Sequence, residues 1–287
     1  MDKRVIGIIG GSGLYQIDGL ADAAWRRVES PFGATSDEFC FGTLDGQAVV
    51  FVPRHGRGHV LPPPDINFRA NIDALKRCGV TDIVSLSAVG SLREDLMPGD
   101  FVVVDQFIDR TFARSKSFFG TGCVAHVSMA RPVCGRVGDA LAAAAAPVGL
   151  ALKRGGTYLV MEGPQFSSLA ESALYRSWKC DVIGMTNMPE AKLAREAELP
   201  YASVAMVTDY DCWHEDFAHV EVAHIVEVLN ANAARARELV RRLAQALPAR
   251  RPASPIDTAL DGAVITAREA RDPAMVDKLS AVAGRVL

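Results

Sequence analysis

The stretch YASVAMV, Tyr201–Val207, is followed by TDYDCW, Thr208–Trp213, and so places two aspartates directly behind a run of apolar residues. The run predicts a buried strand over Tyr201–Thr208. Side chains alternate between the two faces of a strand, so Asp209 and Asp211 are expected to point the same way. Paired aspartates at a strand end are also common turn formers, helix caps and cation ligands, and this stretch alone leaves those alternatives open.

Apolar runs of the same kind recur along the chain, with helical patterns between them. Several runs are continuous rather than alternating, which is typical of a sheet buried on both faces. The pattern predicts an α/β fold: a single domain with a mixed, largely parallel central sheet flanked by helices. The other expected strands are Arg4–Gly10, Gln47–Pro53, Asp82–Ala88, Phe101–Asp105, Thr157–Glu162 and Asp181–Met185. The expected helices are Ile66–Cys78, Arg136–Ala146, Ser168–Lys179, Pro189–Glu198 and Val222–Ala246.

The C-terminal region differs in composition from the rest of the chain. LPARRPASPI, Leu247–Ile256, has the prolines and charge of a linker, and Asp257–Leu287 is too short to fold alone. We therefore expect one domain over residues 1–247 and a linker with a helical appendage over residues 248–287. Its terminal helix should begin at about Ala274 and pack on its own domain or on a neighbouring subunit.

Composition and charge exclude several classes of protein. The 287 residues are 49% hydrophobic and 23% charged, with a net charge of -3, which gives no general attraction to nucleic acid or to anionic membranes. The short apolar run of the first residues breaks into glycines, without the h-region and cleavage site of a signal peptide, so we expect none, and no other run approaches a membrane span. Scattered cysteines without CxxC spacing are expected to be reduced, as in a cytoplasmic protein, although a bridged pair remains open. They are Cys40, Cys78, Cys123, Cys134, Cys180 and Cys212.

A glycine-rich turn, Gly10-Gly11-Ser12-Gly13, follows the first expected strand. Its glycines allow the backbone to approach an anion, and Ser12 adds a hydroxyl donor. A dinucleotide fingerprint would need a third glycine where Gln16 stands, so a small inorganic anion fits better than a nucleotide cofactor. A plain tight turn remains the alternative.

The loop PRHGRGH, Pro53–His59, follows another expected strand. Arg54 can bind a phosphate group through two parallel hydrogen bonds, and His55 can donate to it or hold a proton. The spacing of His55 and His59 would suit zinc only on a helix, which the glycines disfavour, so we expect no metal site.

Two more polar segments follow expected strands. Ser85–Leu92 brings small hydroxyl residues that can surround an anion or a sugar. In Met161–Ser168, Phe166 can stack on a base, while Ser167 or Ser168 can cap the next helix with Glu171. Such loops at several strand ends indicate one site built at the edge of the sheet. In that site, two carboxylates can divide the roles of acid and acceptor, which suits protonating a ring nitrogen while accepting from a neighbouring amino group.

Taken together, these motifs resemble a known family. The segments GIIGGSGL, SPFG, RHGRGH, SAVGSLRE, PGD, VDQFIDRT, EGPQFSS, MTNMPEAKLARE and TDYDCW occur in this order. In this combination the chain resembles the methylthioadenosine phosphorylases of the trimeric purine nucleoside phosphorylase family, from about Val5 to about Ala246. The resemblance implies a nucleoside phosphorylase-like fold and a cytoplasmic homotrimer. It also implies phosphorolysis of methylthioadenosine to adenine and methylthioribose-1-phosphate, with phosphate as co-substrate and no metal or organic cofactor.

The resemblance assigns roles to matching positions. Asp209 would serve N7 of the purine and Asp211 its amino group, and these two with His55 are the expected catalytic residues. An acid at Asp209 needs a raised pKa, which burial and Asp211 can supply. The expected phosphate-binding residues are Ser12, Arg54, His55, Ser87, Ala88 and Thr186. The expected substrate-binding residues are His59, Phe166, Ser167, Met185, Val222 and Ile225, with His126 reaching the site of an adjoining subunit.

The chain departs from that family at a few positions. Ser12 and Ser87 stand where many relatives carry threonine, and Gly184 stands before Met185 where a larger polar residue is common. The first two changes keep the hydroxyl group, so the expected phosphate site is retained.

Other functions remain as alternatives. A methylthioinosine or general purine nucleoside phosphorylase would share the fold, but an ionised aspartate is mismatched to a purine carbonyl oxygen. A catalytically silent nucleoside-binding protein would not need a phosphate cluster beside an acid. A nicotinamide-dependent dehydrogenase is disfavoured by the failed glycine fingerprint.

Overall fold

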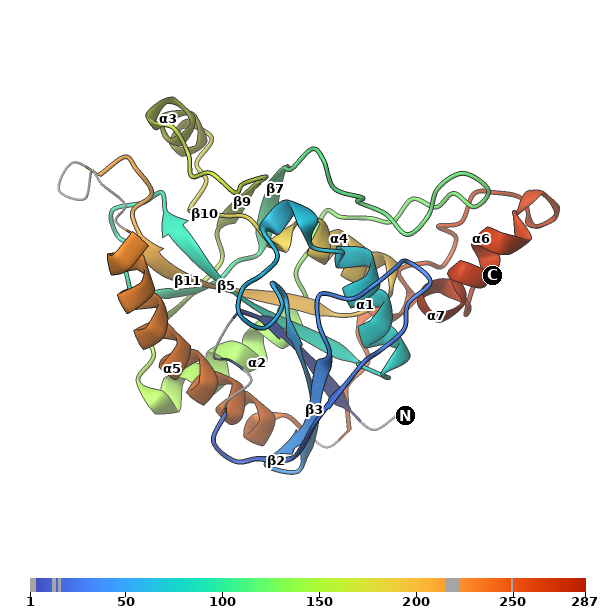
Figure 1. Cartoon of the computed structure of the whole chain (residues 1–287), viewed down its shortest axis with the longest axis horizontal. Coiled ribbons are helices and arrows are strands. Elements are labelled where there is room, and N and C mark those ends of the chain that lie inside the picture. The colour runs from blue at the N-terminus through green and yellow to red at the C-terminus, as the bar shows by residue number, and fades with distance from the viewer. Residues whose placement is uncertain (1–3, 12–13, 15–16, 215–221, 249) are drawn as a thin grey trace.

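One mixed sheet runs through the protein (Figure 1). The computed structural model describes residues 4–11, 14, 17–214, 222–248 and 250–287, without the side chains of residues 222–226. The strands are β1 (Val5–Gly10), β2 (Leu20–Arg26), β3 (Phe39–Leu44), β4 (Gln47–Pro53), β5 (Asp82–Ser91), β6 (Phe101–Val103), β7 (Gln106–Arg110), β8 (Leu152–Arg154), β9 (Thr157–Met161), β10 (Val182–Gly184) and β11 (Tyr201–Asp209). The helices are α1 (Phe68–Arg77), α2 (Gly135–Ala145), α3 (Leu169–Ser177), α4 (Asn187–Glu196), α5 (Val222–Ala246), α6 (Pro273–Lys278) and α7 (Ser280–Ala283).

The sheet confirms the predicted fold class. In the described residues its main path runs β2-β3-β4-β1-β5-β10-β9-β7, while β11 pairs with β5 and β6, and β6 with β8. The central pairs β4-β1, β1-β5 and β5-β11 are parallel, whereas β2-β3, β3-β4, β5-β10 and β6-β11 are antiparallel. The sheet is therefore mixed and largely parallel at its centre, where the longest apolar runs lie.

The predicted elements are present within a few residues, but four strands were missed. β2 holds a bulge between Ala21 and Ala24 and a left-handed Asp22, with φ 55°, so its side chains do not alternate regularly. β3 carries a central glycine, and β7 and β8 are short and polar. These strands lack the continuous apolar run that predicted the others.

Helices cover both faces of the sheet. On one face α1 and α4 bury residues such as Ile72 and Ala191 in a core shared with Val50 and Val207. On the other, α2 and α5 bury residues such as Leu141 and Leu239 in a second core. Because both faces are covered, the central strands can be continuously apolar. Of the described helices, none is long and apolar enough to cross a membrane.

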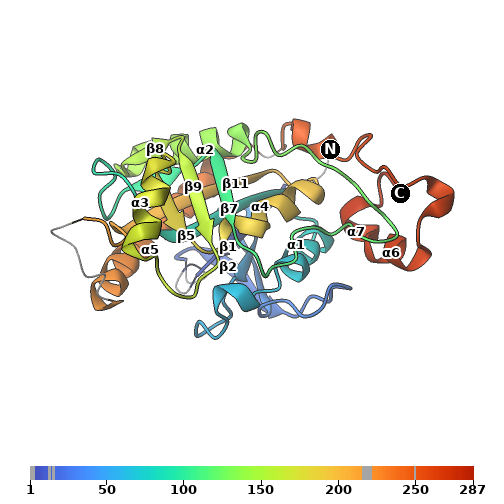
Figure 2. The same ribbon diagram turned by 90° about the horizontal axis from the view of Figure 1, so that it is seen from above.

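The chain after α5 returns to the domain and ends in α6 and α7, beside α1 (Figure 2). Leu279, Val282 and Ala283 are buried in the first core. Glu198, in the turn after α4, accepts from the backbone N–H of Leu260 at 2.9 Å and from the guanidinium of Arg285 at 2.5 Å. This terminal segment therefore packs on its own chain through both apolar and charged contacts.

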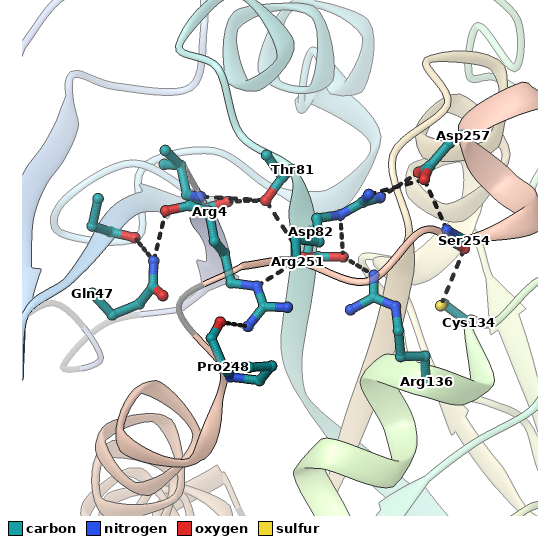
Figure 3. Close-up of polar contacts among 12 residues, drawn as sticks. Arg4, Gln47, Thr81, Asp82, Cys134, Arg136, Pro248, Arg251, Ser254 and Asp257 are labelled. Carbon is teal, nitrogen blue, oxygen red and sulfur yellow. Dashed lines mark hydrogen bonds and ion pairs between the residues drawn. The ribbon is translucent and has the colours of Figure 1, made fainter. Parts of the chain in front are cut away.

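A second attachment of this segment centres on Asp82, at the start of β5 (Figure 3). The carboxylate faces Arg4 at 3.6 Å and Arg251 at 3.2 Å, and it also accepts from Arg136 of α2. Arg251 is paired in turn with Asp257. Through these three arginines Asp82 ties β1, β5, α2 and the C-terminal segment together at the end of the sheet opposite to the predicted site. Loss of the Asp82 carboxylate would leave buried arginines without a partner, which is costly.

Candidate functional site

A cavity of about 280 Å³ opens at the carboxyl ends of the central strands. It lies where β1, β4, β5, β10 and β11 give way to loops, the usual place for a site in an α/β sheet. The predicted site residues that line it are Arg54, His55, His59, Ser87, Ala88, Phe166, Met185, Thr186, Asp209 and Asp211. Loops far apart in the sequence are thus brought to one cavity.

The other predicted residues either lie outside the described part of the chain or stand apart from the lining of the cavity. Ser12 lies outside the described residues, as do the side chains of Val222 and Ile225. Ser167 lies beside the cavity, where its carbonyl oxygen accepts from the thiol of Cys212 at 3.4 Å. His126 lies on a different cavity, between residues 116–129 and α4. Its expected role toward an adjoining subunit stays a prediction.

Arg54 is fixed by a carboxylate that the sequence did not reveal. Its guanidinium donates through Nε to Glu190 Oε2 at 2.8 Å and through Nη2 to Glu190 Oε1 at 3.1 Å, and both side chains are almost fully buried. Further bonds run from Nη2 to Ser85 Oγ at 2.5 Å and from Nη1 to the carbonyl of Leu86 at 3.2 Å. Burial alone would lower the pKa of Arg54, and Glu190 more than reverses this. Arg54 is therefore a fixed positive charge at the cavity wall.

A chain of hydrogen bonds continues from Glu190 to the cavity. Glu190 Oε1 accepts from Tyr201 Oη at 2.8 Å and from Ser85 Oγ at 2.6 Å. Ser85 Oγ in turn accepts from Asn187 Nδ2 at 3.0 Å. Ser87 Oγ then donates to Asn187 Oδ1 at 3.0 Å. The hydroxyl hydrogen of Ser87 is thus already bonded to Asn187. Ser87 can donate to a ligand only if it gives up this bond.

Tyr158 occupies the space beside Gly184. A Cβ atom at Gly184 would lie 2.0 Å from Tyr158 Oη, so no larger residue fits without moving the ring. The tyrosine is fully buried, and its hydroxyl lies 3.3 Å from Ser87 Oγ. The expected departure at Gly184 therefore leaves room for the buried Tyr158 ring of β9. The neighbouring Thr186 has a buried hydroxyl without a hydrogen-bond partner among the described residues.

His55 presents a lone pair to the cavity. Its Nδ1 lies 2.9 Å from the carbonyl oxygen of Leu61, which can only accept, so Nδ1 carries the hydrogen and Nε2 is left as an acceptor. Burial, followed by the charge of Arg54, lowers the pKa of His55 to about 4. The ring of His59 stacks on it, with centroids 4.1 Å apart. His55 is therefore a neutral acceptor at neutral pH.

The two aspartates reach the cavity by a turn and not by strand alternation, so that part of the prediction was wrong. β11 ends at Asp209, and Asp211 has a left-handed backbone with φ 54°. Its N–H donates to Asp209 Oδ1 at 2.8 Å, which is the turn-forming role left open above. Gly90 permits this arrangement, because a Cβ atom there would lie 2.9 Å from Asp209 Oδ1. Both carboxylates nevertheless line the same cavity.

Burial raises the pKa of Asp211, whose side chain is almost fully enclosed. The hydroxyls of Ser172 and Ser167 oppose this shift, and the charge of Glu171 adds to it. Ser172 belongs to α3 and was not predicted as a site residue. The raised pKa predicted for Asp209 stays a prediction.

Phe166, shortly before α3, forms part of the cavity wall. The Phe166 ring is 55% exposed, so one side is open for a planar ligand. Ser168 caps α3, since its hydroxyl accepts from Glu171 N–H at 3.3 Å while the Glu171 carboxylate accepts from Ser168 N–H at 2.8 Å. The predicted capping box is confirmed at Ser168.

A second buried arginine, also missed, holds the loop of Met185. Arg114 Nη1 donates to the carbonyls of Met185 at 2.6 Å and Met188 at 2.8 Å. Its Nε donates to the Glu162 carboxylate at 2.9 Å. Arg114 thus fixes the ends of β9 and β10 relative to one another. Apolar side chains also line the cavity, among them Leu14, Met206, Leu229 and Ala233.

The missed residues share one feature: each acts on the cavity through another residue. Glu190 lies in the motif MTNMPEAKLARE, and Arg114 follows the motif VDQFIDRT. The partner of each is far away in the sequence. The one signal in the sequence that could have pointed to Glu190 was the need of a buried Arg54 for a carboxylate partner. In the described part of the chain, no group of three or more His, Cys, Asp or Glu residues could hold a metal ion.

Comparison with known proteins identifies similar chains. The family model of the phosphorylase superfamily matches residues 5–245. The S-methyl-5'-thioadenosine phosphorylase of Rhodospirillum rubrum is 63% identical over 99% of this chain and 98% of its own, and that of Cereibacter sphaeroides is 62% identical over 99% of both. The crystal structure of a methylthioadenosine phosphorylase from an antarctic soil metagenomic library superposes with a TM-score of 0.93 at 46% identity, over 98% of this chain and 99% of that one.

We predict that the His55 ring stays neutral, with its hydrogen on Nδ1, throughout the neutral pH range. Because folding lowers its pKa to about 4, protonation favours the unfolded chain as pH falls from about 6.5 toward that value. Nitrogen-15 NMR of the histidine rings checks this, with His55→Gln identifying the signal. A His55 that titrates between pH 6 and 7, or that carries its hydrogen on Nε2, would contradict the assignment.

Proposed function

Because this chain belongs to the phosphorylase superfamily, we propose that it is an S-methyl-5'-thioadenosine phosphorylase, a pentosyltransferase of methionine and purine salvage. The reaction converts methylthioadenosine and phosphate to adenine and 5-methylthioribose-1-phosphate. One observation supports it most directly. A fixed arginine with a neutral histidine and a pair of carboxylates line the same cavity. The first pair suits phosphate, and the second suits an aminopurine.

Phosphate is the nucleophile in this proposal. The remaining Nη1 hydrogen of Arg54, the Thr186 hydroxyl and the backbone near Ala88 bind its oxygens, with Ser87 and Ser12 as further contacts. His55 Nε2 accepts the P–OH hydrogen of monoprotonated phosphate, so a neutral ring suits this ion better than a second cation would. The bound anion lies beside the sugar and stabilises its developing positive charge.

The purine leaves as the sugar becomes oxocarbenium-like. The bond between C1' and N9 breaks, one between C1' and a phosphate oxygen forms, and Asp209 donates a hydrogen bond or a proton to N7. Ionised Asp211 accepts from the 6-amino group, and Phe166 and Ser167 lie beside the ring. Met185, held by Arg114, lies under the ribose. His59, Val222 and Ile225 complete the pocket for the methylthio end. The chemistry needs neither a metal nor an organic cofactor.

Free base released from methylthioadenosine, methylthioinosine and adenosine, each with and without phosphate, tests the proposal. We expect phosphate-dependent adenine release, highest for methylthioadenosine, because the carboxylate pair favours an amino group and the apolar side chains of the cavity favour an uncharged, non-hydroxylated 5' group. Preference for methylthioinosine would instead favour the alternative purine specificity. Absence of turnover with every substrate would refute the enzyme assignment.

Asp211→Asn should reduce turnover of methylthioadenosine about tenfold or more and that of methylthioinosine much less, because the lost acceptor serves only the amino group. The pH dependence has a defined sign. Since burial raises the pKa of Asp211, acidification protonates it earlier than an ordinary carboxyl, so the preference for the aminopurine falls as pH falls. Initial rates of both substrates from pH 8 to pH 5 measure this. Equal loss on both substrates, or an unchanged pH profile in the variant, would contradict the role.

We extend the proposal to a cytoplasmic homotrimer. Large apolar side chains stay exposed near the cavity in a single chain, such as Phe112 at 81% and Leu169 at 70%, which a neighbouring copy would cover. The His126 segment is fixed to the terminal residues 248–287, since His126 N–H donates to the Ala263 carbonyl at 2.9 Å, and in this arrangement it reaches a neighbour's cavity. The six cysteines are free thiols, as suits that compartment.

Light scattering should give three times the 30.8 kDa mass of the chain, because the apolar surface described above favours association. His126→Ala should then leave the mass unchanged while weakening binding of methylthioadenosine. A monomeric protein with full activity would refute both the trimer and the shared cavity.

A further inference from the structure

Trp213 closes the TDYDCW motif, yet the chemistry of the cavity leaves it without a role. Its ring is half-buried and does not line the cavity. It packs instead against a small cluster that includes Leu92, Leu159 and Ile183, at the ends of β5, β9 and β10.

Several contacts hold the Trp213 indole, and one of them is with the ring of His214, whose centroid lies 5.1 Å away. The indole Nε1–H donates to the backbone carbonyl of Ser91 at 2.7 Å. The guanidinium carbon of Arg176, on α3, lies 3.7 Å from the ring centroid, close enough for a cation–π interaction. The ring of Tyr210 meets it edge to face, with centroids 5.8 Å apart at 84°. Both the edge and the face of the indole are therefore engaged.

The turn that carries Asp211 needs such an anchor. Asp211 adopts φ 54°, a conformation that costs about 1 kcal/mol or more for a residue other than glycine. Its regular strand pairing has ended, because the register between β11 and β5 shifts between Val207 and Asp209. The bond from Asp211 N–H to Asp209 Oδ1 links the turn only to itself.

Strand β5 supplies the fixed support at both ends of the turn. Asp209 pairs with Gly90 on that strand, and Trp213 bonds to Ser91, the next residue. Arg176 strengthens the same support, since its Nε donates to the Leu92 carbonyl at 3.3 Å while its charge lies over the indole. The Asp211 carboxylate is thus carried on a short span whose two ends are attached to adjacent residues of one strand.

We propose that Trp213 is a positioning residue, which through its bond to Ser91 and its stack with Arg176 places the Asp211 carboxylate against the 6-position of the purine. This inference rests on the proposed function. A shift of about 1 Å in a reacting or recognising group is enough to change rates severely. The indole therefore sets how strongly the enzyme prefers a 6-amino over a 6-oxo purine, without contacting either.

The test compares Trp213→Phe with wild type in steady-state assays on methylthioadenosine and methylthioinosine. Phenylalanine keeps an aromatic ring for Arg176 and removes the N–H donor to Ser91. We expect kcat/KM for methylthioadenosine to fall about fivefold, as for loss of one hydrogen bond, while that for methylthioinosine changes less than twofold. KM for phosphate should stay unchanged, because Arg54 and His55 are not attached to this turn. Arg176→Met, which removes both the charge over the indole and the bond to the Leu92 carbonyl, should lower the same ratio.

The chain contains a matched control. Trp178 follows the end of α3, with the guanidinium of Arg110 5.9 Å from its ring centroid, and it belongs neither to the turn nor to the cluster that packs against Trp213. Trp178→Phe should leave the substrate ratio as in wild type, even if it lowers the unfolding temperature. An unchanged ratio in Trp213→Phe, or an equal fall with both substrates, would overturn the positioning role while wild-type turnover upholds the function. Wild type without phosphate-dependent turnover would refute the function and this inference with it.

Discussion

The buried ion pair between Arg54 and Glu190 is the interaction on which the cavity depends. Removing both charges from water costs several kcal/mol each, and attraction offsets this only when the remaining donors and acceptors are also satisfied. Ser85, Tyr201 and the Leu86 carbonyl meet that condition. The pair therefore forms only when β4, β5, β11 and α4 are all in register. In exchange, one edge of a guanidinium is fixed at the cavity and cannot rotate toward solvent.

Strand β5 carries buried polar residues with fixed partners along its whole length. A strand covered on both faces is normally apolar, yet β5 buries polar side chains at its start, middle and end. Asp82 pairs with arginines from three segments, and Ser85 and Ser87 join the chain of hydrogen bonds behind the cavity wall. The backbone carbonyl of Ser91 supports the turn after β11, while its hydroxyl donates to the Arg93 carbonyl. The strand thus links the attachment of the C-terminal segment at one end to the turn that carries Asp211 at the other. Its polar residues are tolerated because each has a partner in the fold.

What the sequence predicted well was local. Continuous apolar runs located the central strands, and the capping signal of Ser168 and Glu171 depends on residues three apart. The strand-end loops identified most of the cavity lining, because the carboxyl ends of parallel strands meet at one edge. Polar or bulged strands such as β2 and β8 gave no such signal.

Glu190 and Ser172 were missed because a glutamate or serine near a helix start also satisfies helix preferences. Nothing in the neighbouring sequence reveals that the partner of each lies in a distant segment, Arg54 for Glu190 and Asp211 for Ser172. The position of Asp211 was misjudged for a related reason. Alternation of side chains assumes that the strand continues to Asp211, whereas the strand ends at Asp209, whose carboxylate accepts from the Asp211 N–H and forms a turn.

The charges of the cavity are arranged for a reaction in which an anion attacks while a base leaves. Arg54 is kept charged and His55 neutral by the same burial, because only Arg54 has a buried carboxylate partner. An imidazolium beside Arg54 would bind phosphate more tightly before the reaction without favouring its attack. Such uniform binding does not lower the barrier of the chemical step. Enclosure raises the pKa of Asp211, yet this carboxyl group must stay ionised to accept from the 6-amino group. Two ionised aspartates and a phosphate dianion in one cavity would repel each other, so a proton on Asp209, the proposed acid, lowers that repulsion and leaves Asp211 as the acceptor. The turn therefore keeps two carboxyl groups at one cavity, so that one can be the acid and the other the acceptor as the purine leaves.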